Sequence, residues 1–205
     1  MSSEGKPTAT VVLASASAAR ARLLRAAGLP IQVDPAAIDE DEIKASLRQA
    51  GATAAQLAET LAELKAMRIS RRHPGALVVG ADQVLQQGDV LFDKPADIAA
   101  ARRQLTALRG QDHDLVSAVV VVRDGVRLWQ HIGQARLTMR DFSELFLDQY
   151  LSNAGGAVLG SVGAYQFEGL GIQLFRRVDG DYFTILGLPL LPLLDFLREQ
   201  GVVSS

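Results

Sequence analysis

The dipeptide Asp124-Gly125 is flanked by two segments, residues 114–122 and 126–138. Asp-Gly is a strong signal for a two-residue β-turn, because both residues tolerate the positive φ angles that such a turn requires. Two strands joined by so short a turn pair antiparallel to each other. We therefore predict a β-hairpin here, so the sheet of this chain must contain at least one antiparallel pair of strands.

Outside the hairpin, short apolar runs typical of buried strands alternate with stretches whose apolar residues fall on one helical face. The strands are expected at residues 9–14, 76–86 and 172–178. The helices are expected at residues 19–28, 53–71, 97–108, 143–151 and 188–200. Residues 31–42 are extended and then acidic, and residues 155–171 are rich in glycine. Alternating strands and helices with one hairpin predict an α/β fold built on a mixed sheet.

The composition fits a globular domain, since 48% of the 205 residues are hydrophobic and 21% are charged. This length suits one domain, which we expect at residues 9–205, with residues 1–8 as a flexible leader. The polar first residues lack the apolar stretch of a signal peptide, and no apolar run approaches the roughly 20 residues that span a bilayer. We therefore expect a cytoplasmic protein that does not enter a membrane.

Several chemistries are excluded by what the sequence lacks. It has no Cys, which rules out a disulfide, a Cys-ligated zinc and a Cys nucleophile. It has no Walker-type phosphate loop, and Ser15 is not in the G-x-S-x-G motif of hydrolases. His73, His113 and His131 show no metal-ligand spacing, so we interpret them as structural or surface residues. A formal net charge of −2 argues against binding of long nucleic acid, although not of a nucleotide.

Ser15, Ser17 and Arg20 lie where the first expected strand gives way to the first expected helix. A helix N-terminus offers free N–H groups and a partial positive charge, so hydroxyls and an arginine at that end could hold phosphate. The alternative is a serine that caps the helix beside a solvated arginine.

Asp82 interrupts the apolar strand segment VVGADQV. Because burial of an unpaired carboxylate is costly, we expect Asp82 at a strand end or facing a cleft, as a general base or metal ligand. A turn cap or a structural ion pair is the alternative. The acidic run from Asp39 to Glu42 could add a carboxylate for Mg²⁺, although such runs are commonly solvated. Lys65 and Lys94 could contact phosphate, but neither is specific by itself.

Taken together, several short motifs resemble those of the Maf family of nucleotide pyrophosphatases, in the same order along the chain. They are LASASAARARLL (13–24), IDE (38–40), LAELKA (61–66), GADQV (80–84), DKP (93–95), GAYQFEG (163–169) and GDYFTILGLPL (180–190). The resemblance implies an elongated, ITPase-like α/β fold in which a mixed central sheet is flanked by helices and a cleft lies between two lobes. It implies hydrolysis of a nucleoside triphosphate to the monophosphate and pyrophosphate with a divalent cation, Mg²⁺ or Mn²⁺.

The resemblance also assigns roles to residues. It makes Asp82 the catalytic base, and it makes Asp82 with Asp39 or Glu40 the candidate metal ligands. The phosphate-binding set that it implies is Ser15, Arg20, Lys65 and Lys94. It further suggests a homodimer and a house-cleaning role with a link to arrest of cell division.

Substrate choice in this family is implied to depend on three positions, which here are Ala19, Gln83 and Glu168. Members that prefer dTTP and UTP resemble GADT and QG at the last two positions, with an arginine at the first. Members that prefer 7-methyl-GTP resemble GSDQ and EG. Gln83 and Glu168 match the second pattern, whereas Ala19 matches neither. A carboxylate such as Glu168 could accept hydrogen bonds from N1–H and the exocyclic amine of guanine, so we predict a guanine-type or modified purine substrate.

Three other interpretations remain open from the sequence. The first is a non-enzymatic, nucleotide-binding regulator of cell division, which would not need the base Asp82. The second is a phosphatase, which would release orthophosphate. The third is a structural protein whose polar cleft binds no ligand.

Overall fold

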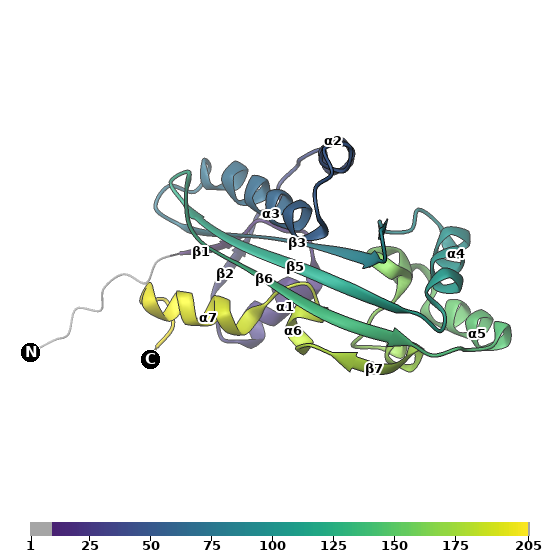
Figure 1. Cartoon of the computed structure of the whole chain (residues 1–205). Coiled ribbons are helices and arrows are strands. Elements are labelled where there is room, and N and C mark those ends of the chain that lie inside the picture. The colour runs from purple at the N-terminus through teal and green to yellow at the C-terminus, as the bar shows by residue number, and fades with distance from the viewer. Residues whose placement is uncertain (1–9, 205) are drawn as a thin grey trace, which may run out of the picture.

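The computed structural model describes residues 10–204, so the predicted leader at residues 1–8 lies outside the described residues. The described residues form one sheet of seven strands, in the order β2-β1-β3-β5-β6-β7 with β4 beside β3 (Figure 1). The strands are β1 (Val11–Leu13), β2 (Ile31–Val33), β3 (Leu77–Gln87), β4 (Val90–Phe92), β5 (Asp112–Arg123), β6 (Val126–Met139) and β7 (Phe175–Asp179). Strand β1 is parallel to β2 and β3, and the other pairs are antiparallel. The predicted α/β fold with a mixed sheet is therefore confirmed.

The predicted hairpin is the longest paired element of this sheet. Strands β5 and β6 pair from Asp112 opposite Thr138 to Arg123 opposite Val126. Asp124 and Gly125 have φ angles of 50° and 76°, and positive φ at both central residues is the requirement of the type I′ turn. The hairpin runs along most of the length of the molecule (Figure 1).

The described chain contains seven α-helices. They are α1 (Ala18–Ala26), α2 (Glu40–Gln49), α3 (Ala54–Ser70), α4 (Ile98–Leu108), α5 (Glu144–Ala154), α6 (Tyr182–Ile185) and α7 (Leu190–Glu199). The five predicted helices are confirmed, whereas α2 and α6 were not predicted. The glycine-rich segment forms short 3₁₀ turns, and the last of these extends to Leu174. Strand β7 consequently begins at Phe175 rather than at residue 172.

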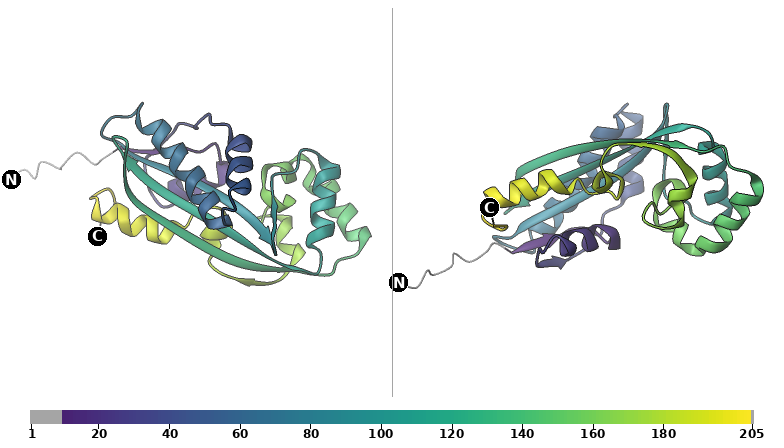
Figure 2. Two further views of the ribbon diagram at one scale, coloured as in Figure 1. Left: turned by 45° about the horizontal axis from the view of Figure 1, so that its top comes forward. Right: turned by 90° about the horizontal axis from the view of Figure 1, so that it is seen from below.

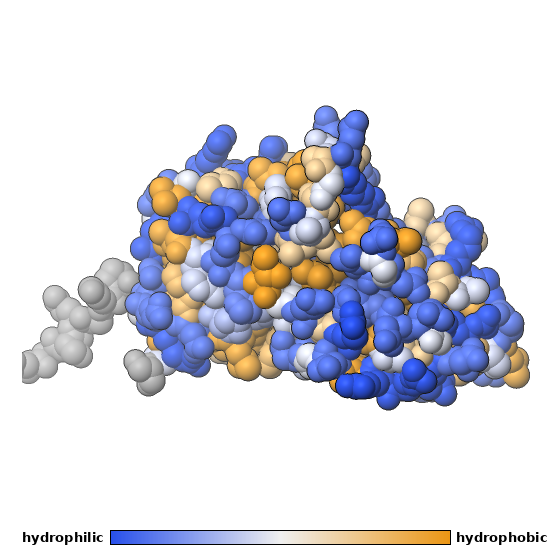
Figure 3. All heavy atoms as spheres, viewed as in Figure 1, coloured by the Kyte–Doolittle hydropathy of each residue, from blue (hydrophilic) through white to orange (hydrophobic). Residues whose placement is uncertain are grey.

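Helix α3 lies on one face of the sheet, α1 and α7 lie on the other, and α4 and α5 gather at one end (Figures 1 and 2). Three hydrophobic clusters fill these spaces. Strand β5 contributes to all three, with Leu115 at the α4–α5 end and Val119 and Val120 on the two faces. On the face shown in Figure 3, apolar groups are interspersed among polar ones. No helix of the described residues is both long and apolar enough to cross a membrane.

Candidate active site

A gap in the edge of β3 defines the candidate site. Strand β1 pairs with residues 77–79 of β3, and β4 pairs with residues 85–87 on the same side of the sheet. The described residues provide no strand partner for residues 80–84 on that side. Asp82 is at the centre of this gap. We predicted that Asp82 would lie at a strand end or face a cleft. The strand end is wrong, because β3 continues past Asp82 to Gln87. The second placement agrees with the structure, since no described strand pairs with this part of the edge.

Asp82 is buried in an ion pair with Lys65 of α3. The Lys65 ammonium lies 2.6 Å from Asp82 Oδ1 and 2.8 Å from Glu40 Oε1, so one lysine joins two carboxylates. Both Asp82 and Lys65 are 6% exposed. The second oxygen of Asp82, Oδ2, is buried without a hydrogen-bond partner in the described part of the chain. A buried carboxylate oxygen without a partner is costly, so this atom is the strongest indication of a ligand or water position.

Gly80 explains why Lys65 can reach the strand. A Cβ atom at Gly80 would lie 2.0 Å from the carbonyl oxygen of Ala62 and 2.9 Å from Cβ of Ala66. Side chains two residues apart on a strand share a face, so Gly80 and Asp82 both face α3. The absence of a side chain at Gly80 lets α3 approach closely enough for its lysine to meet Asp82.

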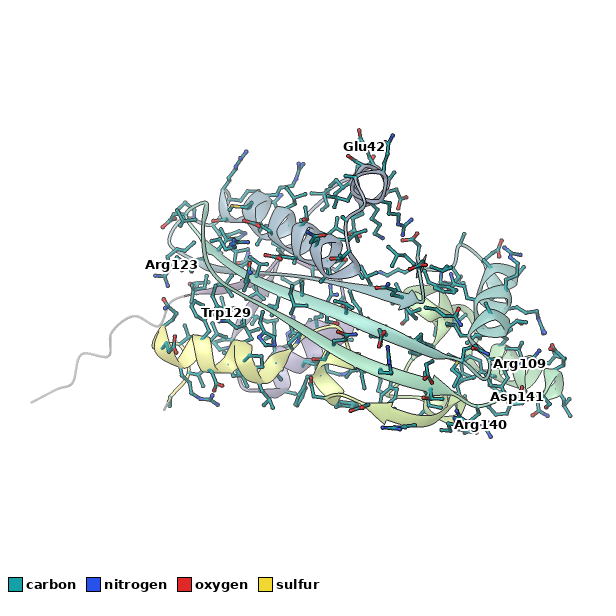
Figure 4. All side chains as sticks on the ribbon, viewed as in Figure 1. Glu42, Arg109, Arg123, Trp129, Arg140 and Asp141 are labelled. Atoms are coloured by element: carbon teal, nitrogen blue, oxygen red, sulfur yellow. The ribbon has the colours of Figure 1, made fainter. Side chains whose placement is uncertain are left out.

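The start of α2 places the two candidate acidic residues, Asp39 and Glu40, in different surroundings. Asp39 is its N-cap, and Asp39 Oδ1 accepts a hydrogen bond from the Glu42 backbone N–H at 3.1 Å. Glu40 is the residue that reaches Lys65, while Glu42 projects away from the sheet (Figure 4). Burial opposes ionisation of Glu40, but the hydrogen bond and charge of Lys65 outweigh it and hold the pKa of this carboxyl below its ordinary value. Glu40 is therefore the better placed second carboxylate.

Arg20 is buried rather than solvated, at 8% exposure, so the alternative of a solvated arginine was wrong. Its Nε donates to the Gly187 carbonyl at 2.8 Å, and its Nη1 donates to the Ala81 carbonyl at 2.8 Å and to Ser15 Oγ at 3.0 Å. No acceptor among the described residues bonds its Nη2. Burial lowers the pKa of the Arg20 guanidinium, against the opposing charges of Asp82 and Glu40. An arginine stays charged in proteins, so Nη2 can still donate to an anion.

The residues at the start of α1 can both cap the helix and bind phosphate, two roles that the sequence analysis treated as alternatives. Ser17 is the N-cap and accepts a hydrogen bond from the backbone N–H of Arg20. Ser15 is buried and accepts from the Arg20 guanidinium. Because its oxygen is the acceptor in that bond, its own hydrogen remains to be donated to a phosphate oxygen. A helix cap and an anion cradle therefore coexist at this end.

Lys94 lies on the rim of the site. It is exposed, and its charge is among those that lower the pKa of Glu40. Its neighbour Asp93 accepts from Lys44 at 3.0 Å and from Arg48 at 3.0 Å, both on α2. Sequence reasoning missed these two basic residues because α2 was not predicted; their spacing of four residues, one helical turn, was the available signal. Of the four predicted phosphate-binding residues, Lys65 contacts Asp82 at the centre of the gap, and Arg20 contacts both Ser15 and the Ala81 carbonyl beside it. The fourth, Lys94, follows β4, the strand that borders the gap.

The model of the Maf-like protein family matches residues 10–200. The chain belongs to the Maf family.

Curated relatives of this Maf protein carry two different names. A protein of Paramagnetospirillum magneticum named nucleoside triphosphate pyrophosphatase is 62% identical over 93% of this chain and 98% of its own length. One of Rhodospirillum rubrum with the same name is 52% identical, over 95% of this chain and 96% of its own length. One of Brucella abortus named 7-methyl-GTP pyrophosphatase is 51% identical, over 97% of this chain and all of its own length.

The three predicted specificity positions of this Maf protein lie in different surroundings. Gln83 faces away from Asp82, as its neighbour on the strand must, and its Nε2 donates to Ser117 Oγ at 2.9 Å. Glu168 forms an ion pair with Arg22 of α1 at 2.7 Å. Ala19 is half-buried on the same helix, three residues before Arg22. Residues three apart on a helix are neighbours, so Ala19 lies one turn before the residue that Glu168 contacts.

The residues of this Maf protein fit a divalent cation bound partly by its substrate. No group of three or more His, Asp or Glu side chains that could hold a metal occurs in residues 10–204. Asp82 and Glu40 nevertheless converge on Lys65, and Asp82 Oδ2 is unpaired. Mg²⁺ commonly binds through one or two carboxylates plus substrate phosphates, which is the donor set that this site offers.

Proposed function

We propose that this Maf protein hydrolyses a nucleoside triphosphate to the nucleoside monophosphate and pyrophosphate. The observation that carries the proposal is Asp82, a buried carboxylate with one free oxygen beside Lys65, at the same gap as the open Nη2 of Arg20. A base next to preorganised cations suits attack of water on a phosphoryl group. The names of the curated relatives support the same reaction.

In the proposed mechanism, Asp82 Oδ2 orients the attacking water and accepts its proton. The water oxygen bonds to the α-phosphorus, the bond from that phosphorus to the α–β bridging oxygen breaks, and pyrophosphate leaves with this oxygen. Lys65 holds Oδ1 at 2.6 Å and so fixes the direction of the other oxygen. Arg20 Nη2, the Ser15 hydroxyl and Lys94 bind the triphosphate and offset its charge. A divalent cation such as Mg²⁺ or Mn²⁺, held by Asp82 and Glu40, would supply further neutralisation of that charge. Asp39 is less suited to this role, because it caps α2.

The products test the reaction. Purified protein should convert a nucleoside triphosphate to monophosphate and pyrophosphate, should lose this activity in EDTA, and should recover it with Mg²⁺ or Mn²⁺. Orthophosphate as the primary product would show a phosphatase instead. Absence of turnover with retained nucleotide binding would favour the regulator of cell division.

We further propose a guanine-type or modified purine base. The proposal is supported by the Glu168 carboxylate, of which only Oε1 is bonded within residues 10–204, to Arg22, and by the 7-methyl-GTP pyrophosphatases among the relatives. The kcat/KM values for UTP, dTTP, GTP and 7-methyl-GTP should rank the purines first. Glu168→Gln should reduce that preference. Glu59→Gln is the matched control, since Glu59 also pairs with an arginine, Arg127, at 3.0 Å. UTP or dTTP as the best substrate, or an unchanged ranking in Glu168→Gln, would contradict the assignment.

A cytoplasmic location stays a prediction from the sequence. A homodimer, a house-cleaning role and a link to arrest of cell division stay predictions from the family resemblance. Sedimentation analysis of the purified protein would decide the oligomeric state.

A further inference from the structure

Three residues that are opposite one another on adjacent strands form the surface against which α6 packs. Gln83 of β3 is opposite Ser117 of β5, and Ser117 is opposite Gly133 of β6. The row therefore presents an amide, a hydroxyl and a position without a side chain. A Cβ atom at Gly133 would lie 2.5 Å from Thr184 Oγ1, so only a glycine admits Thr184 of α6 at this distance. Helix α6 lies against β5 and β6 (Figure 1).

The side chains of this row bind the turn after α6 through the carbonyl oxygen of Thr184. It accepts from Ser117 Oγ at 2.8 Å and from Gln83 Nε2 at 3.1 Å. It also accepts from the backbone N–H of Gly187 at 3.0 Å, which closes the turn. Ser117 and Thr184 are 0% and 1% exposed. Hydrogen bonds in such a dry environment fix geometry strongly, because water cannot replace a lost partner.

Gly187 connects this turn to the candidate active site. Its carbonyl oxygen accepts from Arg20 Nε at 2.8 Å. Its φ angle is +86°, and a Cβ atom there would lie 3.2 Å from Arg20 Nη2. The turn thus sets the position of the guanidinium and leaves room beside Nη2, the one nitrogen of this group without an acceptor in the described part of the chain.

We propose that Ser117 and Gln83 are positioning residues for Arg20, acting through the Thr184–Gly187 turn. Neither side chain needs to touch the substrate, because the path runs from the sheet to the Thr184 carbonyl and from Gly187 to the guanidinium. The Nε2 of Gln83 donates to Ser117 Oγ and to the carbonyls of Thr184 and Ile185. Loss of Gln83 should therefore lower kcat/KM for every nucleotide, whichever base it carries. This role rests on the proposed pyrophosphatase activity.

Substitution of Ser117 by alanine tests the path. Ser117→Ala should lower kcat/KM about tenfold or more, because small displacements of a charge-stabilising group reduce rates strongly. Ser70→Ala is the matched control: Ser70 is also buried, and its Oγ accepts a single bond, from Gly125 N–H at the hairpin turn. Its kcat/KM should stay within about twofold of the wild type. Gln83→Met should lower kcat/KM by a similar factor for all four nucleotides.

A double-mutant cycle separates a positioning role from a general structural one. In an Arg20→Lys background, where the bond to Gly187 is no longer made by a guanidinium, Ser117→Ala should have little further effect. Equal losses in both backgrounds would overturn the role, because the hydroxyl would then act independently of Arg20. If Ser117→Ala does not fold, Gln83→Met in the same cycle decides the question.

The two proposals fail in different ways. Wild-type activity with Ser117→Ala equal to Ser70→Ala would overturn the positioning role and leave the pyrophosphatase function intact. A change in base ranking without a general loss in Gln83→Met would also overturn it, by showing that Gln83 reads the base. Wild-type protein without pyrophosphate release would overturn the proposed function and the role with it.

Discussion

Replacement of Lys65 by methionine should destabilise the fold far more than its position in a polar site suggests. Methionine keeps the length of the side chain but removes the only hydrogen bond that residues 10–204 make to Asp82 Oδ1. Because Oδ2 already lacks a partner, the carboxylate would be buried with neither oxygen bonded. Asp82, Lys65 and Glu40 carry a summed charge of −1, which becomes −2 in the variant.

The magnitude follows from this burial. Removal of one partner of a buried ion pair typically costs about 3–5 kcal/mol. For a chain of this length, 1 kcal/mol shifts Tm by about 2–4 °C, so Tm should fall by about 6–20 °C. Urea titration followed by circular dichroism would give the change in unfolding free energy, and a thermal scan would give Tm.

Two further variants test the reasoning. Lys44→Met removes a lysine that pairs with two partly exposed carboxylates, Asp93 at 3.0 Å and Glu40 at 4.0 Å. Each keeps another cation, Arg48 for Asp93 and Lys65 for Glu40, so the change should cost no more than about 1 kcal/mol. Adding Asp82→Asn to Lys65→Met removes the stranded charge and should recover most of the lost stability. If Lys65→Met and Lys44→Met were equally stable, or if the double variant were the least stable of all, the reasoning would be refuted.

Three other predictions concern catalysis, pH and backbone strain. Asp82→Asn should lower kcat by about 10²–10⁴ while the fold is kept, and near wild-type turnover would assign the base elsewhere. Burial lowers the pKa of His113 to about 4, so the unfolded state binds more protons between that value and its ordinary pKa of about 6.5. Unfolding free energy should therefore fall by about 3 kcal/mol as pH drops through this window, and His113→Gln should flatten the profile. Gly187→Ala should cost about 1–3 kcal/mol and reduce activity, whereas Gly88→Ala, at φ +56° in open space, should leave kcat/KM unchanged.

The fold was predictable where a local pattern decided the structure. The Asp124-Gly125 turn needed only the φ preferences of two residues, and the helix over residues 54–70 needed only its apolar face. Helix α2 was missed because its acidic start was interpreted as a solvated run, although an N-cap Asp39 followed by acidic residues is a signal for a helix start. Helix α6 is only four residues long, too short for any periodicity.

The candidate site was predictable in its residue types but not in its geometry. Asp82 was predicted as a site residue because burial of an unpaired carboxylate within an apolar strand is costly. That it lies mid-strand, at a gap between β1 and β4, depends on pairings between segments far apart in the chain. The role of Gly187 beside Arg20, 167 residues earlier, had no local signal at all. The metal, the phosphate set and the specificity positions stay predictions.

The two long strands that cross all three hydrophobic clusters have a consequence for unfolding. Leu85 of β3 and Leu115 of β5 pack in the cluster at the α4–α5 end, while other residues of the same strands pack in the clusters on both faces. If the cluster at the α4–α5 end unfolded, β3 and β5 would be displaced, and the clusters on the two faces of the sheet would lose the residues that these strands contribute. We therefore expect calorimetry to show a single cooperative transition, with equal calorimetric and van't Hoff enthalpies. Fragments that divide the chain within β3 or β5 should fail to fold, so the shared sheet makes this elongated molecule one thermodynamic unit.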